Sequence, residues 1–182
     1  MTNQNEFTWI TEIHLVEYDP QWPMEFEAEA ERLEGLLGER AVGIHHVGST
    51  AVPGLDAKPV VDLLVEVSDL REVQQMTDVF EEAGYEVLGE NGIPGRHFIT
   101  RNEEGERTHD VNIFESGHDE ITRMILFRDR MRKNPDEATA YSELKNKLAS
   151  MYKNEPIRYT QGKSDFILGA VDAQKEFLET RN

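Results

Sequence analysis

The chain has 182 residues, a formal charge of −17 and no cysteine. This length suits one compact domain that buries a substantial core. No stretch approaches 18 uncharged apolar residues, so the sequence predicts no membrane span. The first residues show neither a basic start nor an apolar run, and we therefore expect a cytoplasmic protein without a secretory signal. The lack of cysteine excludes a disulfide framework, a thiolate metal cage and a cysteine nucleophile.

Charge is distributed unevenly along the chain. The 36 acidic residues against 19 basic ones argue against binding to extended nucleic acid, which requires clustered positive charge. Residues 6–40 contain ten acids and two bases, whereas residues 96–163 contain 12 acids and 13 bases. The second region can form a local positive pocket for a small phosphate. Solvated helix faces kept soluble by excess charge are the simpler alternative.

The first half of the chain reads as strand, helix and two further strands. Residues 13–18 alternate weakly and predict a short strand that ends at Asp19-Pro20. Apolar residues at helical spacing then predict a helix that ends at Gly38, with an outer face of solvated glutamates. Further strands are expected over 42–47 and 60–67, and the second of these is apolar enough to be buried on both faces. The helix face consists of Phe26, Ala30, Leu33 and Leu37, and the glutamates are Glu25, Glu27, Glu29, Glu31 and Glu34.

The second half begins with mixed elements and becomes helical. A capping-box pattern at Asp69 predicts a helix that runs to Gly84, followed by a short strand over 85–88. Strands over 96–101 and 108–115, joined by a polar loop, predict a hairpin. Helices follow, and Asn134-Pro135 marks a helix start. We expect an α+β fold, a mixed sheet of about five strands with packed helices. It forms a single domain over 1–182, and the pattern allows a helical C-terminal subregion over 118–182.

Asp62 is the most informative residue of the sequence. It lies in the middle of the strand predicted to be buried on both faces, where a carboxylate is costly unless it is paired, hydrogen-bonded or bound to metal. Asp62, Leu64 and Glu66 share one face of that strand. Asp62 is therefore a candidate metal or acid–base carboxylate, and the alternative is that it lies at a sheet edge or satisfies backbone groups.

A second polar strand face supplies a possible partner for Asp62. Asp110 and Asn112 alternate with Val111 and Ile113, so the two polar side chains point away from the apolar face. If this face meets Asp62, two carboxylates and an amide converge in a set of oxygen ligands that suits Mg²⁺ or Mn²⁺. A strand side that faces solvent is the alternative.

Phosphate-binding candidates lie on both sides of this face. Gly48, Ser49 and Thr50 follow a strand directly, an arrangement in which backbone amides and hydroxyl groups can approach a phosphate. An ordinary turn explains the same residues. The other candidates are basic or aromatic residues that suit an anionic ligand: Lys58, Arg96, Arg158, Tyr159 and Lys163. His45 and His46 are adjacent on a strand, so they face opposite ways and cannot bind one metal together.

Several separated motifs resemble the GrpB family. The central motif is His46-Val47-Gly48-Ser49-Thr50-Ala51-Val52-Pro53-Gly54-Leu55, followed by Lys58-Pro59-Val60-Val61-Asp62-Leu63. Matching segments are Tyr18-Asp19-Pro20 with Trp22, Leu126-Phe127-Arg128-Asp129 with Asn134-Pro135, Tyr141 with Leu144-Lys145, and Tyr159-Thr160 with Lys163-Ser164-Asp165-Phe166-Ile167. The resemblance spans about residues 13–167, with its motifs in the expected order.

The resemblance implies a nucleotidyltransferase-like fold related to the DNA polymerase beta superfamily. In that superfamily Gly48-Ser49 would contact a triphosphate, and Asp62 would be the first acidic metal ligand. The superfamily pattern has a second acid two residues later, where this chain has Leu64, and relatives tend to have histidines at the positions of Asp110 and Asn112. Members of the family also occur fused to dephospho-coenzyme A kinases.

Two functions follow as expectations. The first is a nucleotidyltransferase that binds a nucleoside triphosphate with Mg²⁺ or Mn²⁺ and transfers a nucleotidyl group to a small acceptor. Asp62 and Asp110 would be both its catalytic residues and its metal ligands. The second is a non-catalytic module that binds a nucleotide or another small phosphorylated ligand without turnover. Neither function involves a membrane, and neither identifies a protein partner.

Overall fold

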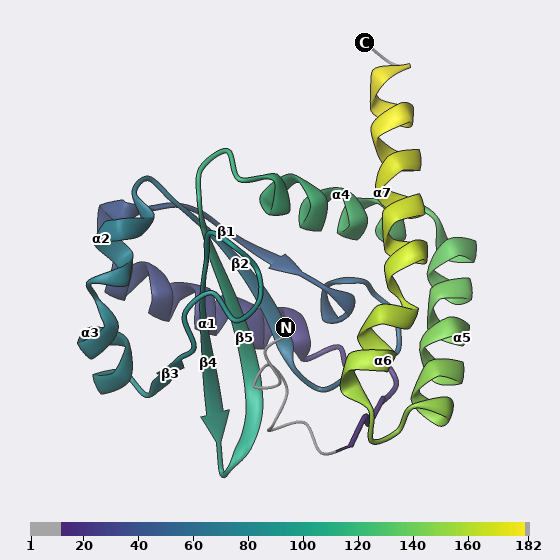
Figure 1. Ribbon diagram of the computed structural model, residues 1–182, viewed down its shortest axis with the longest axis horizontal. Coiled ribbons are helices and arrows are strands. Elements are labelled where there is room, and N and C mark those ends of the chain that lie inside the picture. The colour runs from purple at the N-terminus through teal and green to yellow at the C-terminus, as the bar shows by residue number, and fades with distance from the viewer. Residues whose placement is uncertain (1–11, 181–182) are drawn as a thin grey trace.

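The computed structural model describes residues 12–180, which form an α+β fold around a five-stranded mixed sheet (Figure 1). The strands lie in the order β1-β2-β5-β4-β3, with β2 and β5 parallel and all other neighbours antiparallel. The strands are β1 (Ala41–Val47), β2 (Val61–Val67), β3 (Tyr85–Val87), β4 (Arg96–Glu103) and β5 (Glu106–Glu115). The helices are α1 (Trp22–Leu37), α2 (Leu70–Gln74), α3 (Thr77–Glu82), α4 (Asp119–Lys133), α5 (Pro135–Met151), α6 (Pro156–Gly162) and α7 (Ser164–Glu179). The expected fold class is confirmed.

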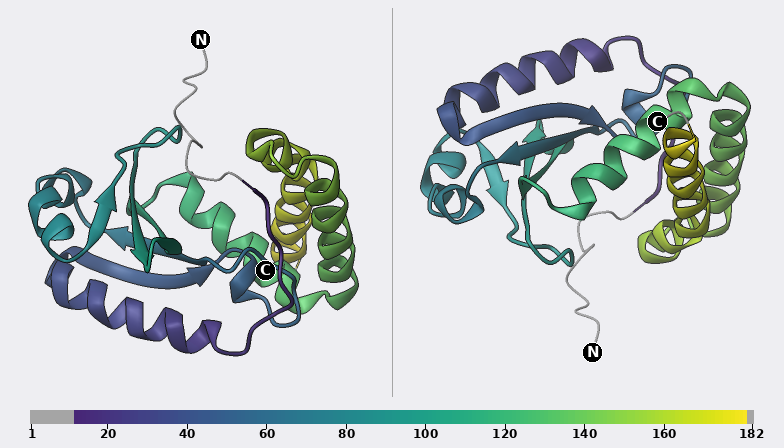
Figure 2. Two further views of the ribbon diagram at one scale, coloured as in Figure 1. Left: turned by 90° about the horizontal axis from the view of Figure 1, so that it is seen from below. Right: turned by 90° about the horizontal axis from the view of Figure 1, so that it is seen from above.

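Helices cover both faces of the sheet and one of its ends. Helix α1 lies along one face, α4 crosses the opposite face, and α5, α6 and α7 gather beside α4 (Figure 2). Each face has its own apolar core, because side chains alternate along the strands. On the α1 face Leu63 and Val65 pack against Leu33. On the α4 face Leu64 packs against Phe114 and Ile121.

The alternation along β2 explains why its single aspartate is tolerated. Asp62 and Leu64 share the α4 face, as predicted. Helix α4 covers Leu64, which is fully buried, but at Asp62 the same face borders a cavity. The strand is therefore apolar wherever a helix covers it, and its carboxylate lies where the cover is open.

The segment between β1 and β2 is part of the core rather than a surface loop. A short 3₁₀ turn, Ser49–Ala51, follows β1. Val52 and Leu55 are almost fully buried and pack against Phe127, Met131 and Tyr141 of the C-terminal helices. This packing fixes the Gly48-Ser49 turn between the sheet and the helices.

Three expectations on local structure need correction. The strand expected over 13–18 is reduced to one isolated bridge between Val16 and Ala57. The helix expected from Asp69 to Gly84 is two short helices, α2 and α3, with a break at Gln75-Met76. The hairpin loop is shorter than expected, because the strands continue to a two-residue turn at Glu104-Gly105, where both residues have positive φ.

Glu29 was expected on the solvated face of α1, and this was wrong. Its side chain is 1% exposed, accepts a hydrogen bond of 2.5 Å from the Tyr85 hydroxyl and forms an ion pair of 2.6 Å with Arg101. The helix lies across the sheet so that this position faces β3 and β4. Helical spacing alone could not show which polar residue the sheet would cover.

The C-terminal half is helical, and α5 begins at Pro135 as predicted. Helix α7 packs along α4 and then extends past it (Figure 1). Among residues 12–180, no helix combines the length and the apolar character that a membrane crossing requires.

Candidate functional site

A cavity of about 470 Å³ opens on the α4 face of the sheet. Its floor is formed by side chains of β2, β4 and β5, and its walls come from the Gly48-Ser49 turn, the 91–93 segment and helices α4 to α7. Two carboxylates, Asp62 and Asp110, line it together with five cationic side chains: Lys58, Arg96, Arg123, Lys145 and Lys163. In a protein of charge −17, this is a local excess of positive charge, as the charge distribution along the sequence allowed.

Asp62 points at the Gly48 turn. Gly48 has φ +70°, and a Cβ atom built on it would lie 2.9 Å from both Cβ and Cγ of Asp62, with Oδ2 closer still. Only glycine combines this backbone conformation with such a close approach. The turn and the carboxylate are therefore one structural unit at the end of β1.

Asp62 and Asp110 lie side by side on the cavity floor. They are partners in register on the parallel strands β2 and β5, so neighbouring strands present both carboxylates to one face. Burial, and then the negative charge of Asp110, raise the pKa of Asp62 to about 7. Burial also raises the pKa of Asp110, against the opposing effect of Arg107, which pairs with it at 2.5 Å. Both carboxyl groups therefore ionise less readily than an exposed aspartate does.

Ser49 is tied to two side chains of α5. The buried Lys145 ammonium donates a hydrogen bond of 3.0 Å to the Ser49 hydroxyl and another to the Asp56 carbonyl oxygen. Burial lowers the pKa of Lys145 to about 8. Burial raises the pKa of Tyr141, and a hydrogen bond from Ser49 opposes this rise. Lys145, Ser49 and Tyr141 therefore form a connected polar chain beside the Gly48 turn.

Lys163, which is half-buried, adds a second ammonium group to the same side of the cavity. Burial, then the nearby charges of Lys58 and Lys145, lower the pKa of Lys163 to about 7, although Asp62 opposes the change. Its Nζ lies 4.3 Å from the ring centre of Tyr159, which is almost fully buried. Lysines crowded in this way favour a ligand that brings several negative charges.

Arg96 and Asn112 form the part of the floor nearest β4. Arg96 Nη1 donates to Asn112 Oδ1 at 2.9 Å, and the Asn112 amide donates to the Leu63 carbonyl oxygen at 3.3 Å. The Arg96 guanidinium also stacks on the ring of Phe98, at 4.3 Å from its centre. Asn112 is thus fixed by protein contacts.

The structure brings most of the predicted site residues together. Those that line the cavity are Gly48, Ser49, Thr50, Lys58, Asp62, Arg96, Asp110, Asn112, Tyr159 and Lys163. Arg158 does not line it: its side chain is exposed and pairs with Glu155 at 3.2 Å. The reason is that Arg158 and Tyr159 are adjacent on α6 and point in different directions, and Tyr159 is the inward one. What any of these residues binds stays a prediction.

Sequence reasoning missed several cavity residues, namely Tyr141, Lys145, Arg123 and the 91–93 segment. A signal for Lys145 was present. It lies four residues after Tyr141 and three before Leu148, on the apolar stripe of its helix, where a lysine is unexpected without a partner. Arg123 has no comparable signal, because it is one of several arginines in α4.

His46 points away from the cavity. Its Nε2 lies 2.9 Å from Thr50 Oγ1, and its ring stacks on Phe26 of α1 with centres 4.8 Å apart. Burial, then Arg132 and Arg128, lower its pKa to about 4, so the ring is neutral. His46 supports the turn through Thr50 without lining the cavity.

The carboxylate oxygens of the cavity suit one hard cation that takes its remaining ligands from a bound phosphate. Residues 12–180 contain no group of three or more histidine or acidic side chains that could hold a metal ion. The two carboxylates Asp62 and Asp110 remain, and Mg²⁺ is commonly held by one or two carboxylates together with substrate phosphates. Leu64, the position of a second acid in the related pattern, is buried in the apolar core.

The arrangement of the sheet and its helices is similar to the nucleotidyltransferase fold of Cid1. The Cid1 poly(U) polymerase with MgGTP bound is similar, with a TM-score of 0.52 at 16% identity over 74% of this chain and 44% of that one. Cid1 in complex with the UTP analog UMPNPP gives a TM-score of 0.51 at 15% identity, over 74% and 42% of the two chains. These likenesses show the fold alone.

Within that fold class, the chain belongs to the GrpB family, whose model, described as GrpB protein, matches residues 12–172. The crystal structure of conserved protein GrpB from Enterococcus faecalis is 37% identical, with a TM-score of 0.84 over 91% of this chain and 99% of that chain. The resemblance found in the sequence motifs is confirmed.

Relatives in the family differ in length. UPF0157 protein YqkA of Bacillus subtilis is 36% identical over 93% of this chain and 49% of its own length. The glutamate-rich protein GrpB of Alkalihalophilus pseudofirmus is 34% identical over 86% and 92%. A dephospho-CoA kinase of Mycobacterium leprae is 24% identical over 91% and 47%. The chain thus spans about half the length of YqkA and of the kinase.

Proposed function

We propose that this protein binds a nucleoside triphosphate with one Mg²⁺ or Mn²⁺ ion and transfers the nucleotidyl group to a small acceptor. The observation that carries the proposal is the pairing of Asp62 and Asp110 in register beneath the Gly48-Ser49 turn. The likeness of the fold to Cid1, solved with MgGTP and with a UTP analog, agrees with it. The excess of cationic side chains in the cavity supplies the charge that a triphosphate requires.

The proposal assigns cavity residues to the phosphates, to the cation and to the proton of the acceptor. The Ser49 hydroxyl and the ammonium groups of Lys145 and Lys163 hold the β- and γ-phosphates. Asp62 and Asp110 would hold the cation, which would neutralise charge on the phosphates. The acceptor oxygen bonds to the α-phosphorus while the bond from that phosphorus to the bridging oxygen breaks. Pyrophosphate leaves, and the proton of the acceptor passes to Asp110. The lysines stabilise the charge that develops on the leaving group.

Binding is the first test. Calorimetric titration with ATP, GTP, CTP and UTP, each with Mg²⁺, is expected to give binding that Asp62→Asn weakens by about tenfold or more, because a charged contact is lost. Glu66→Gln, on the same strand but outside the cavity, is the matched control and is expected to bind normally. No binding at millimolar triphosphate, or binding that Asp62→Asn leaves unchanged, would contradict the proposal.

A non-catalytic nucleotide-binding module is the second candidate. Leu64 and the ion pair between Arg107 and Asp110 favour it, since one carboxylate is absent and another is engaged. Pyrophosphate release across a panel of hydroxyl-bearing acceptors separates the two. Release that depends on Asp110 supports transfer, whereas tight nucleotide binding without release across the panel supports the module.

A further inference from the structure

The cavity has a second cationic end, distinct from the lysine side. Arg96 on β4 and Arg123 on α4 line it, together with the backbone of residues 91–93. The charges that act on the two carboxylates follow this division. Lys58 and Arg107 act on both carboxylates, but Lys163 acts on Asp62 and Arg96 acts on Asp110. The carboxylate pair therefore lies between the two ends.

The arginine end has a preorganised wall. Arg96 donates to the carbonyl oxygens of Glu90 and Asn91, at 3.1 and 2.5 Å, and so fixes the start of the loop. The Gly95 amide donates to the Glu90 carboxylate at 2.7 Å. Asn91 has φ +40°, a left-handed conformation that asparagine adopts more readily than most residues with a side chain. These contacts shape the loop before any ligand arrives.

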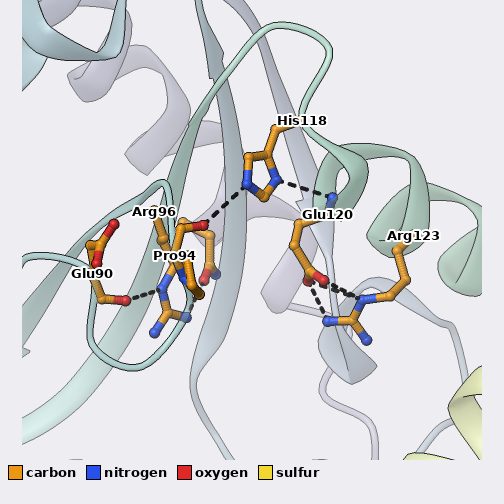
Figure 3. Close-up of polar contacts among 7 residues, drawn as sticks. Glu90, Pro94, Arg96, His118, Glu120 and Arg123 are labelled. Carbon is orange, nitrogen blue, oxygen red and sulfur yellow. Dashed lines mark hydrogen bonds and ion pairs between the residues drawn. The ribbon is translucent and has the colours of Figure 1, made fainter.

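His118 joins this loop to α4, as Figure 3 shows. Its Nε2 lies 3.1 Å from the Pro94 carbonyl oxygen, and its Nδ1 accepts a hydrogen bond of 3.2 Å from the Glu120 amide. One side chain therefore fixes both the loop next to Arg96 and the first turn of the helix that carries Arg123. The spacing between the two arginine-bearing walls is set by the fold.

Arg123 is oriented by Glu120. Its Nε donates to both carboxylate oxygens at 2.9 Å, and its Nη2 pairs with one of them (Figure 3). Nη1 makes no hydrogen bond to any residue of 12–180. A guanidinium held by a carboxylate on one edge presents its other edge in a fixed direction, and that planar edge matches a carboxylate or a phosphate.

We infer that this end of the cavity binds the acceptor and that the acceptor carries an oxyanion, a phosphate or a carboxylate, which Arg123 recognises. The inference rests on the proposed function, because it assigns the lysine end to the triphosphate. It places the acceptor next to Asp110, where the proposed proton transfer occurs. Arg96 positions the loop and Asn112 behind this subsite.

Matched pairs of acceptors that differ only in an anionic group test the inference. Ribose 5-phosphate is compared with ribose, and gluconate with glucose, each titrated into the full chain saturated with Mg²⁺ and a non-hydrolysable triphosphate. The anionic member of at least one pair is expected to bind, and Arg123→Gln is expected to weaken it about tenfold to a hundredfold. The pair with the larger difference in affinity between its anionic and neutral members shows whether the recognised group is a phosphate or a carboxylate. Arg123→Lys keeps the charge but loses the planar edge, so its affinity for the anionic acceptor is expected to lie between those of the wild type and Arg123→Gln.

Arg130→Gln is the matched control. Arg130 lies on the same helix and is held by Glu137 through the same two nitrogens, but outside the cavity. It is expected to leave every affinity unchanged, and a thermal melt of both variants checks the fold. Equal binding of anionic and neutral members, or an equal loss with Arg130→Gln, would overturn the inference.

The two proposals fail in different ways. If Arg123→Gln weakens the triphosphate as much as ribose 5-phosphate, Arg123 belongs to the nucleotide site and the acceptor subsite is refuted. If no triphosphate binds to the wild type, the proposed function fails, and the assignment of this end to an acceptor fails with it. Triphosphate binding without any preference for anionic acceptors leaves the proposed function standing and refutes only the subsite.

Discussion

Replacing Gly48 by alanine tests the link between the turn and Asp62. The new Cβ would lie 2.9 Å from Cβ and Cγ of Asp62 and closer still to Oδ2, in a backbone conformation with φ +70°. Either the carboxylate or the turn must then shift. The turn is held by the packing of Val52 and Leu55, so the strain falls largely on the Asp62 side chain, which must leave its contact with Gly48.

The cost has two parts. A non-glycine residue in this conformation costs about 1–3 kcal/mol, and displacing the packed aspartate adds about 1–2 kcal/mol of overpacking. Together we expect about 2–5 kcal/mol, which lowers the melting temperature of a chain of this size by roughly 4–20 °C. Gly54 is the matched control: it also has positive φ, but nothing lies within 4 Å of its added Cβ. Gly54→Ala should show the backbone cost alone, about 1–3 kcal/mol.

Urea unfolding of Gly48→Ala and Gly54→Ala, and of Asp62→Ala with and without Gly48→Ala, measures the backbone cost and the overpacking cost. Asp62→Ala removes Oδ2 and Cγ, so Gly48→Ala should cost about 1 kcal/mol less in that background. Equal costs of Gly48→Ala with and without the carboxylate would refute the idea that Asp62 points into the turn.

Three further predictions follow from the buried charges. A carboxyl whose pKa is raised to about 7 holds its proton in the folded state while the unfolded chain has lost it, so wild-type stability falls as pH rises from about 4 to 7. The free energy of unfolding of Asp62→Asn should therefore rise relative to that of the wild type by a few kcal/mol over that interval, measured by urea unfolding at each pH. Lys163, with a pKa near 7, should take up a proton when a triphosphate binds at pH 8, seen by calorimetry in buffers of different ionisation enthalpy and reduced in Lys163→Met. Glu29→Ala should cost about 3–5 kcal/mol because it leaves Arg101 and Tyr85 without their partner, whereas the exposed Glu31→Ala should change stability by about 0.5 kcal/mol or less in urea unfolding.

Each of these has a clear contrary result. A stability difference between Asp62→Asn and the wild type that does not vary with pH would mean that the carboxyl titrates alike in both states. Calorimetric heats that do not depend on the buffer would mean that Lys163 does not receive the phosphate charge. Similar losses for Glu29→Ala and Glu31→Ala would mean that the buried ion pair is not formed.

The sequence determined most of the elements and one face of the site. The nearly continuous apolar run in 60–67 predicted a strand buried on both faces, and the alternation in 108–115 predicted a polar face with Asp110 and Asn112. Both are confirmed, because the period of a strand fixes which side chains share a face. The Gly48-Ser49 turn could also be read locally, as could the helix start at Pro135.

Tertiary structure alone decided what surrounds that face. The parallel pairing of β2 with β5 brings Asp62 and Asp110 together across 48 positions of sequence, and helix packing turns Lys145 and Tyr159 inward while it leaves Arg158 in solvent. Helical periodicity states which residues lie on one face of a helix, but not which neighbour that face meets. For the same reason the sequence predicted Glu29 to be solvated, although the sheet covers it. The arginine end of the cavity had no local signal, because it is assembled from β4, a loop and α4.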